Sequence, residues 1–302
     1  MNCSLCPRNC GAARDGVHNG FCGVPAGAMV CRAAPHYGEE PCISGTRGSG
    51  AVFFAGCSLR CVFCQNHDIS RGAAGEAVSV ERLREIFLSL RDQGVHNINL
   101  VTPTQFSHVI AQALDGLELG IPVVWNSSGY ESVETLRALE GLVQIYMPDF
   151  KYSDSALAAE YSFAPDYPRT ALAAIREMYR QVGPFQMDDE GILRRGLLIR
   201  HLILPGAAEN TLRVIDAVED NLPAKNILFS LMSQYTPMEG LEKYPALCRR
   251  VSAAEYERCA SYLDFSDIEY GYFQSPESAT EEMIPAFDGT GVTSRKEKRS
   301  GE

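Results

Sequence analysis

Short apolar runs alternate with amphipathic stretches along the chain from residue 51 onward. The runs read as buried strands over residues 51–55, 97–101, 121–125, 142–147, 197–204 and 226–231, with a last one near 268–273. The stretches between them predict helices. In the clearest of these, Ser79 can cap a helix that carries Leu83, Ile86 and Leu90 on one face. Strands that alternate with helices predict an α/β fold with a parallel sheet.

The number of these units predicts a partial (β/α)6 barrel of the TIM type, because no doubled nucleotide-binding fingerprint is present. In such a barrel the active site lies at the carboxyl ends of the strands. We expect three parts: a cysteine-rich segment over residues 1–44, the barrel over 45–292 and a charged, disordered tail over 293–302. Residues 24–50 read as a linker with weak strand character around residues 28–32.

Three cysteines follow the first predicted strand in one short loop, Cys57, Cys61 and Cys64, at spacing C-x3-C-x2-C. Three thiolates can hold three irons of a cubane [4Fe-4S] cluster and leave the fourth iron open to a small molecule. A disulfide cluster and a zinc site are the alternatives. The zinc alternative lacks an evident fourth ligand.

A second cysteine set occupies the first 22 residues: Cys3, Cys6, Cys10 and Cys22. Glycines among them allow tight turns around an ion. Four thiolates can close a zinc site or hold an auxiliary iron–sulfur cluster, and the spacing does not separate the two. We expect the remaining cysteines to be bystanders or core thiols: Cys31, Cys42 (in a loop), Cys248 and Cys259 (both in helices).

The formal net charge of −11 over 302 residues disfavours binding to nucleic acid or to an anionic membrane. The chain starts without a basic region followed by an apolar stretch, and no run of about 18 apolar residues predicts a membrane span. Eleven cysteines therefore suggest metal binding in the reducing cytoplasm rather than disulfides.

The cysteine loop resembles that of the radical S-adenosylmethionine (SAM) superfamily, and Phe63 before the third cysteine fits the same pattern. The resemblance implies that SAM chelates the open iron. An electron from the cluster then cleaves SAM to a 5′-deoxyadenosyl radical, which abstracts hydrogen from a substrate. Residues 45–290 are similar to the pyruvate formate-lyase activating enzyme and its uncharacterised homologues with an N-terminal cysteine set. This similarity implies a one-electron donor of the flavodoxin or ferredoxin type. The substrate would be a glycyl-radical protein, another peptide or a small molecule.

The same resemblance implies cofactor contacts at the strand ends. Activating enzymes carry Gly-Gly-Glu after the second strand, where this chain has Thr102-Pro103-Thr104. We expect the two threonine hydroxyls to contact SAM in its place, with a helix start at Thr104 as the alternative. Ser128, after the third strand, is expected to contact SAM as well.

Further contacts are implied at the fourth and fifth strands. Asp149 matches the Asp-Leu-Lys of activating enzymes, and Arg200 precedes the Pro-Gly turn at the end of the fifth strand. An arginine inside a barrel needs an anion, and the SAM carboxylate is the expected partner. Phe63 and Asn66 of the cysteine loop complete the expected cofactor contacts.

A second hypothesis is an electron-transfer or binding protein with iron–sulfur or zinc sites and no SAM chemistry. Such a protein needs a fourth cysteine at the first cluster, and Cys31 or Cys42 could be recruited.

Overall fold

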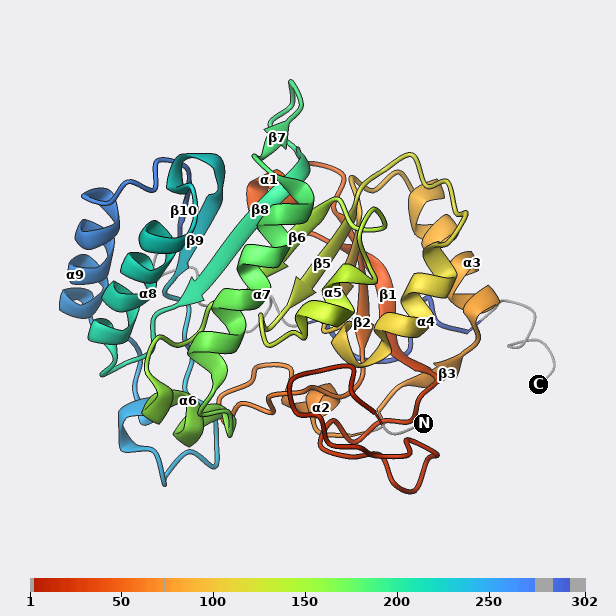
Figure 1. Ribbon diagram of the computed structural model, residues 1–302, viewed down its shortest axis with the longest axis horizontal. Coiled ribbons are helices and arrows are strands. Elements are labelled where there is room, and N and C mark those ends of the chain that lie inside the picture. Colours follow the sequence, from red (N-terminus) through yellow and green to blue (C-terminus); the bar gives the residue numbers. More distant parts are fainter. Residues whose placement is uncertain (1–2, 73, 275–284, 294–302) are drawn as a thin grey trace.

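In the computed structural model, an open, mostly parallel sheet forms the middle of the molecule (Figure 1). In spatial order its parallel strands are β2 (Ser49–Phe54), β4 (Ile98–Val101), β5 (Val123–Ser127), β6 (Ile145–Pro148), β8 (Leu193–Leu202), β9 (Leu228–Met232) and β10 (Gly271–Phe273). Their carboxyl ends point to the lower edge of Figure 1. The α/β class and the parallel sheet predicted from the sequence are therefore confirmed.

The sheet continues beyond β2 into a part that the sequence predicted only weakly. β1 (Ala28–His36) runs antiparallel to β2, and β3 (Glu76–Val78) pairs with β1 at the edge. The weak strand character predicted around residues 28–32 is confirmed, but the prediction of a linker is wrong for the rest of this stretch, because β1 runs on to His36 as a half-buried strand of the main sheet and α1 follows. A short strand, β7 (Gln186–Met187), forms an antiparallel hairpin with β8.

Helices cover one face of the sheet, in front of the strands in Figure 1: α3 (Val80–Asp92), α4 (Ser107–Leu114), α5 (Val133–Arg137), α7 (Tyr167–Val182), α8 (Ala208–Asn221) and α9 (Ala253–Asp264). Ser79 caps α3 as predicted, since its side chain accepts a hydrogen bond from the Arg82 N–H. Shorter elements join these units: α2 (His67–Ser70), α6 (Ser155–Ser162), η1 (Thr104–Phe106), η2 (Ala224–Asn226) and η3 (Pro245–Cys248).

The opposite face of the sheet has its own small core, built around α1 (Pro41–Ser44), which lies behind the strands in Figure 1. Ile43 packs there with Ile145 and Met147 of β6, whereas Tyr146 between them belongs to the core under the helices. This division follows from the alternation of side chains along a strand.

The remaining cysteines follow the sequence prediction in part. Cys31 and Cys259 are buried as expected. Cys42 lies on α1 and not in a loop, because the chain turns helical directly after Glu40. Cys248 is exposed in η3, so its prediction as a core thiol is wrong: only one residue of that short turn, Leu247, is buried.

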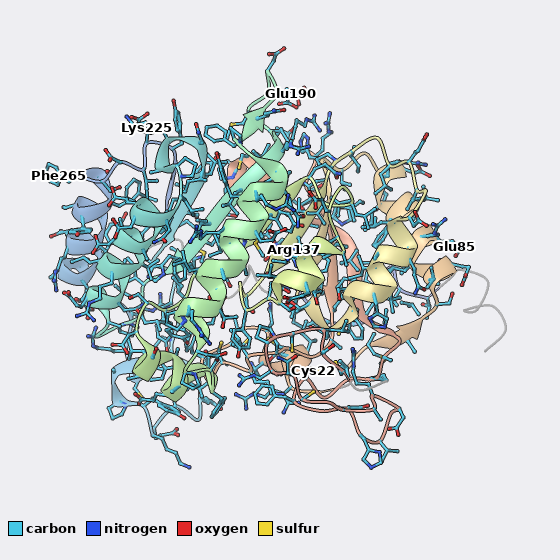
Figure 2. All side chains as sticks on the ribbon, in the orientation of Figure 1. Cys22, Glu85, Arg137, Glu190, Lys225 and Phe265 are labelled. Atoms are coloured by element: carbon cyan, nitrogen blue, oxygen red, sulfur yellow. The ribbon has the colours of Figure 1, made fainter. Side chains whose placement is uncertain are left out.

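The structure describes residues 3–72, 74–274 and 285–293, so all but the first residue of the predicted tail lies outside it. On the outer surface, Glu85, Lys225 and Phe265 project away from the sheet (Figure 2). Among the described residues, no helix is both long and apolar enough to cross a membrane.

Candidate functional site

The three cysteines of the C-x3-C-x2-C motif lie on the loop that follows β2, at the carboxyl edge of the sheet. We call residues 56–66 the cluster loop. Gly56 starts it at φ +75°, and a Cβ there would lie 2.6 Å from the Cys22 carbonyl oxygen. Only glycine therefore allows the loop to approach the N-terminal segment so closely. The Cys64 N–H donates to the Cys61 carbonyl (3.2 Å), which folds the last two cysteines into one turn.

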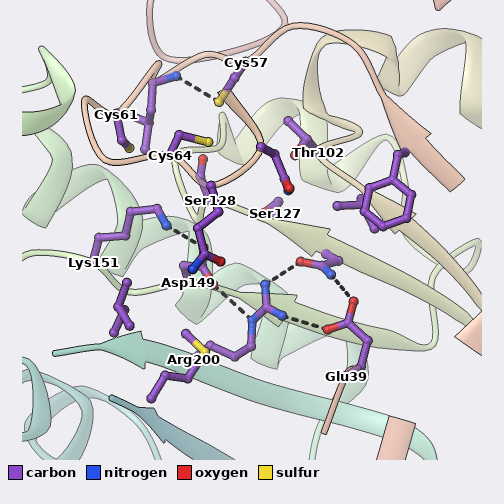
Figure 3. Close-up of a pocket in the computed structure, with 18 of the residues that line it drawn as sticks. Glu39, Cys57, Cys61, Cys64, Thr102, Ser127, Ser128, Asp149, Lys151 and Arg200 are labelled. Carbon is purple, nitrogen blue, oxygen red and sulfur yellow. Dashed lines mark hydrogen bonds and ion pairs between the residues drawn. The ribbon is translucent and has the colours of Figure 1, made fainter. Parts of the chain in front are cut away.

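The cluster loop borders a cavity of about 270 Å³ (Figure 3). Most residues predicted for the cluster and for SAM line this cavity: Cys57, Cys61, Cys64, Phe63, Asn66, Thr102, Ser128, Asp149 and Arg200. They come from four different strand ends and the cluster loop. Cys57 and Arg200, which are 143 positions apart, therefore meet at one place, as the parallel topology requires.

Arg200 is held by protein side chains on three sides. Its Nε donates to Asp149 Oδ1 (3.1 Å), one Nη donates to Glu39 Oε2 (3.0 Å) and the other to Asn126 Oδ1 (2.7 Å). The prediction that Arg200 faces the barrel interior is correct. The reasoning that it needs the SAM carboxylate as its anion is wrong, because Glu39 and Asp149 already supply two carboxylates.

Lys151 is the cation of this cavity with the fewest protein partners. Its Nζ donates to Asp149 Oδ2 at 2.6 Å, the one hydrogen bond that the described residues give it, and an ammonium group has three donors. Burial opposes ionisation of Asp149, yet Lys151 and Arg200 hold the pKa of that carboxyl below its ordinary value. Lys151 is thus placed to donate to a bound anionic group.

Thr104 does not reach the cavity. It begins η1, its side chain is buried, and its Oγ1 donates to Glu131 Oε1 at 2.7 Å. The predicted contact between Thr104 and SAM is therefore wrong, and the alternative of a helix start is correct. Thr102 lines the cavity with a left-handed backbone (φ +57°), which turns the chain sharply at the end of β4.

We expect the free energy of unfolding to depend on pH through the buried carboxyl of Glu131. Burial raises the pKa of its carboxyl from 4.5 to about 7. Between these values the folded state holds a proton that the unfolded chain releases, so this stabilisation is complete below pH 4.5 and disappears as the pH rises through 7. We expect the free energy of unfolding to fall by on the order of 3 kcal/mol from this group. Urea unfolding of the wild type and of Glu131→Gln between pH 4.5 and 8 measures it.

The control for this prediction is Glu118→Gln, which changes an exposed glutamate. The wild type and Glu118→Gln should share one pH profile, and Glu131→Gln should be flatter by the stated amount. Parallel profiles for all three proteins would show that Glu131 does not hold a proton in the folded state.

Two contributors to the site were not predicted from the sequence. Glu39 lies in the segment that read as a linker, and its only signal was that it forms an acidic pair with Glu40 directly after Gly38. Ser162, at the end of α6, donates from its Oγ to Cys61 Sγ (2.8 Å) and accepts a hydrogen bond from the Tyr152 hydroxyl (2.7 Å). Nothing in the sequence around Ser162 points to that contact, since it joins residues 101 positions apart.

The donor set fits an iron–sulfur cluster. Three thiols border one cavity, and protein donors reach two of their sulfurs: Ser162 Oγ at Cys61, and the Leu59 N–H at Cys57 (3.4 Å). Such hydrogen bonds stabilise anionic sulfur. Within the described ranges, no three His, Cys, Asp or Glu side chains are arranged to hold a single metal ion. A four-iron cluster is wider than one ion, so its ligands stand further apart.

Comparison with known proteins agrees with this description. Residues 51–180 match the model of the Radical SAM superfamily, so the chain contains a radical SAM domain. The uncharacterized protein MJ0674 of Methanocaldococcus jannaschii is 28% identical over 281 residues, which are 90% of this chain and 77% of that protein.

Two solved structures of SuiB from Streptococcus suis share the fold. SuiB bound to S-adenosylmethionine aligns with a TM-score of 0.51 at 14% identity, over 76% of this chain and 51% of SuiB. SuiB bound to its precursor peptide SuiA aligns with a TM-score of 0.50 at 13% identity, over 76% and 49%. This chain therefore spans about half the length of the SuiB chains that it matches.

Proposed function

We propose that this protein is a radical SAM enzyme whose Cys57, Cys61 and Cys64 hold a [4Fe-4S] cluster. The observation that carries the proposal is the convergence of these three thiols and of polar side chains on one cavity of about 270 Å³ at the carboxyl ends of the strands. When bound, the cluster supplies one electron that splits SAM into methionine and a 5′-deoxyadenosyl radical, which takes a hydrogen atom from the substrate.

The chain's own residues bind, orient and enclose the reactants. Lys151 can donate to the carboxylate of SAM, and Thr102 and Ser128 can contact its polar groups from neighbouring strand ends. Phe63 is buried between the rings of Tyr161 (6.3 Å) and Tyr235 (6.2 Å), which closes one side of the cluster loop to water. Arg200 and Glu39 form the floor of the cavity, where an ion pair between them (3.0 Å) holds both side chains in place.

The position of the other cysteines disfavours an electron carrier without SAM chemistry. Such a carrier needs a fourth thiolate at the cluster. Cys42 packs in the small core around α1 with Val124 and Leu228, and neither Cys42 nor Cys31 borders the cavity. Among the described residues, no fourth cysteine lines the site, which leaves one iron free for SAM.

We propose a peptide or protein as the substrate, with a glycyl-radical protein as the narrower form. SuiB, which shares the fold, has been captured with its precursor peptide SuiA. In addition, a second hollow of about 990 Å³ lies on the outer side of the cluster loop and shares Gln65 with the cavity. We call this second hollow the outer groove. A chain segment lying in it could reach the cavity past the side chain of Gln65.

The outer groove also suits a reductant of the flavodoxin or ferredoxin type in the cytoplasm. The outer groove is lined by three basic residues, Arg60, Arg71 and Lys243, although the formal net charge of the protein is −11. We expect Arg71→Glu/Lys243→Glu to slow cluster reduction by an acidic flavodoxin about tenfold at low salt, because the steering attraction is reversed. Stopped-flow absorbance follows the rate.

Dithionite provides the first control, since a small reductant needs no docking surface and should reduce both proteins equally. Lys225→Glu provides the second, because Lys225 lies at the upper edge of the molecule in Figure 2 and does not line the outer groove. An unchanged flavodoxin rate in the double variant would contradict docking at the outer groove.

Binding of SAM tests the proposed function directly. The full chain is reconstituted anaerobically with iron and sulfide, reduced, and examined by electron paramagnetic resonance with and without SAM. We expect SAM to change the spectrum of the reduced cluster, because it chelates an iron. An identical spectrum at saturating SAM would contradict the proposal.

A further inference from the structure

The four N-terminal cysteines lie on one tightly folded coil. The Cys3 N–H donates to the Ala12 carbonyl (3.0 Å), and the Gly11 N–H donates back to the Cys3 carbonyl (3.1 Å). A turn closed by the Asn9 N–H and the Cys6 carbonyl (3.1 Å) lies between them. These bonds place Cys3, Cys6 and Cys10 around a single bend of the backbone.

The fourth cysteine returns to the same bend. A Cβ at Gly20 would lie 2.7 Å from Cys10 Sγ, so the chain passes Cys10 two residues before Cys22. The Gly23 N–H donates to the Gly20 carbonyl (3.2 Å), which closes a turn around Cys22 and keeps it beside this bend. The spacing C-x2-C-x3-C-x11-C is therefore folded into one cluster of thiols.

This coil has almost no core of its own. Between residue 3 and the start of β1 the structure contains neither helix nor strand, and its buried residues are confined to Arg14, Cys22 and Val24. A segment this poor in apolar contacts is ordered at a high cost in conformational entropy. A metal bound to thiolates supplies the missing free energy in small cysteine-rich segments.

The coil packs directly on the cluster loop. Arg8 donates from Nε to the Ser58 carbonyl of that loop (2.8 Å) and from Nη2 to the Ser162 carbonyl (3.0 Å) at the end of α6. The same α6 end donates to Cys61 through Ser162 Oγ. Arg8 thus joins the N-terminal coil, the cluster loop and the residue that contacts Cys61.

A second contact runs through the residue next to Cys22. The Phe21 ring lies under the guanidinium groups of Arg8 (4.0 Å) and of Arg60 in the cluster loop (5.3 Å). The carbonyl of Cys22 itself lies against Gly56, where a Cβ would come within 2.6 Å. A displacement of Cys22 therefore displaces the start of the cluster loop.

We propose that Cys3, Cys6, Cys10 and Cys22 bind a thiophilic metal centre, Zn²⁺ or an iron–sulfur cluster, which holds the cluster loop in position. No three His, Cys, Asp or Glu side chains in the described part of the chain form a site for one ion, so metal binding draws the four thiols closer together. The centre acts on the radical site through Arg8, Phe21 and the Cys22 backbone, and needs no electron exchange with it.

Metal analysis of a variant without the radical site tests the ligand set. The full chain with Cys57→Ala, Cys61→Ala and Cys64→Ala keeps only the N-terminal set and is purified anaerobically, once with added Zn²⁺ and once with iron and sulfide. We expect either about one tightly bound zinc per chain or the visible absorbance of an iron–sulfur cluster. Adding Cys6→Ala and Cys22→Ala should abolish both. A folded triple variant that holds neither metal would overturn the proposal.

Hydrogen exchange tests the coupling in a chain that keeps Cys57, Cys61 and Cys64. In Cys6→Ala/Cys22→Ala we expect amides of residues 56–65 to exchange about tenfold faster, since the loop opens more often without its neighbour. Cys248→Ala, which removes an exposed thiol far from the coil in sequence, is the matched control. Arg8→Met should keep the second metal and still loosen the loop.

Unchanged exchange in the loop after loss of the second metal would overturn the coupling. These readouts are metal content and amide exchange, and neither depends on SAM cleavage. If the proposed radical SAM activity fails, metal content and amide exchange still test the N-terminal centre. If the N-terminal centre fails, SAM cleavage still tests the proposed function.

Discussion

Replacement of Cys64 by alanine is expected to leave a folded protein that no longer holds the cluster and cleaves SAM at least about 100-fold more slowly. Loss of a residue that only hydrogen-bonds a metal ligand lowers metal affinity or activity about ten- to a hundredfold. Cys64 is itself one of the three protein ligands in this proposal, so its loss should cost at least as much. The thiol borders the cavity, and its backbone N–H closes the turn with Cys61. Alanine preserves that turn, so the effect should be on the cluster and not on the fold.

Iron analysis and circular dichroism separate these two effects. The reconstituted wild type should contain about four irons at the first site, and Cys64→Ala should lose most of them while its circular dichroism is unchanged. Cys259→Ala is a useful comparison, because it removes a buried thiol in α9 that does not border the cavity. Full iron content in Cys64→Ala would contradict the ligand assignment.

Replacement of Arg200 by methionine should have the largest effect on stability. The change leaves Glu39 and Asp149 side by side without the cation that joins them, at a position where all three side chains are largely buried. Removing one partner from such a network costs about 3–5 kcal/mol. We expect the free energy of unfolding in urea to fall by that amount, and SAM binding to weaken because the cavity floor is lost.

A matched change at the surface shows whether burial is the cause. Arg213 pairs with Glu209 on the outside of α8, with both side chains more than half exposed, and Arg213→Met should cost less than about 1 kcal/mol. Adding Glu39→Gln to Arg200→Met should restore part of the lost stability, since it removes one uncompensated charge. Equal losses in Arg200→Met and Arg213→Met would contradict the network.

The parallel sheet and the cluster loop could be predicted from the sequence because both depend on local patterns. Apolar runs give the strands, and Cys57, Cys61 and Cys64 stand close together in the chain. Asp149 and Arg200 could be placed in the site because they follow or belong to predicted parallel strands, whose carboxyl ends meet.

The partners of these residues could not be predicted, because they are set by packing between distant segments. Glu39 reaches Arg200 only because β1 pairs antiparallel with β2 within the sheet, in a segment that the pattern suggested to be mainly a linker, and α1 then packs on the face opposite the long helices. Thr104 follows a strand end as Thr102 does, yet η1 turns it toward Glu131. The contact between Ser162 and Cys61 depends in the same way on where α6 ends.

The most direct measurement is the amount of 5′-deoxyadenosine formed by the reconstituted full chain with SAM and dithionite under anaerobic conditions. We predict its formation by the wild type at a rate that Cys64→Ala does not support, since the electron must pass from the cluster to the sulfonium of SAM. A wild type with a complete cluster, a spectrum altered by SAM and still no 5′-deoxyadenosine, with candidate peptide substrates present, would contradict the assignment as a radical SAM enzyme.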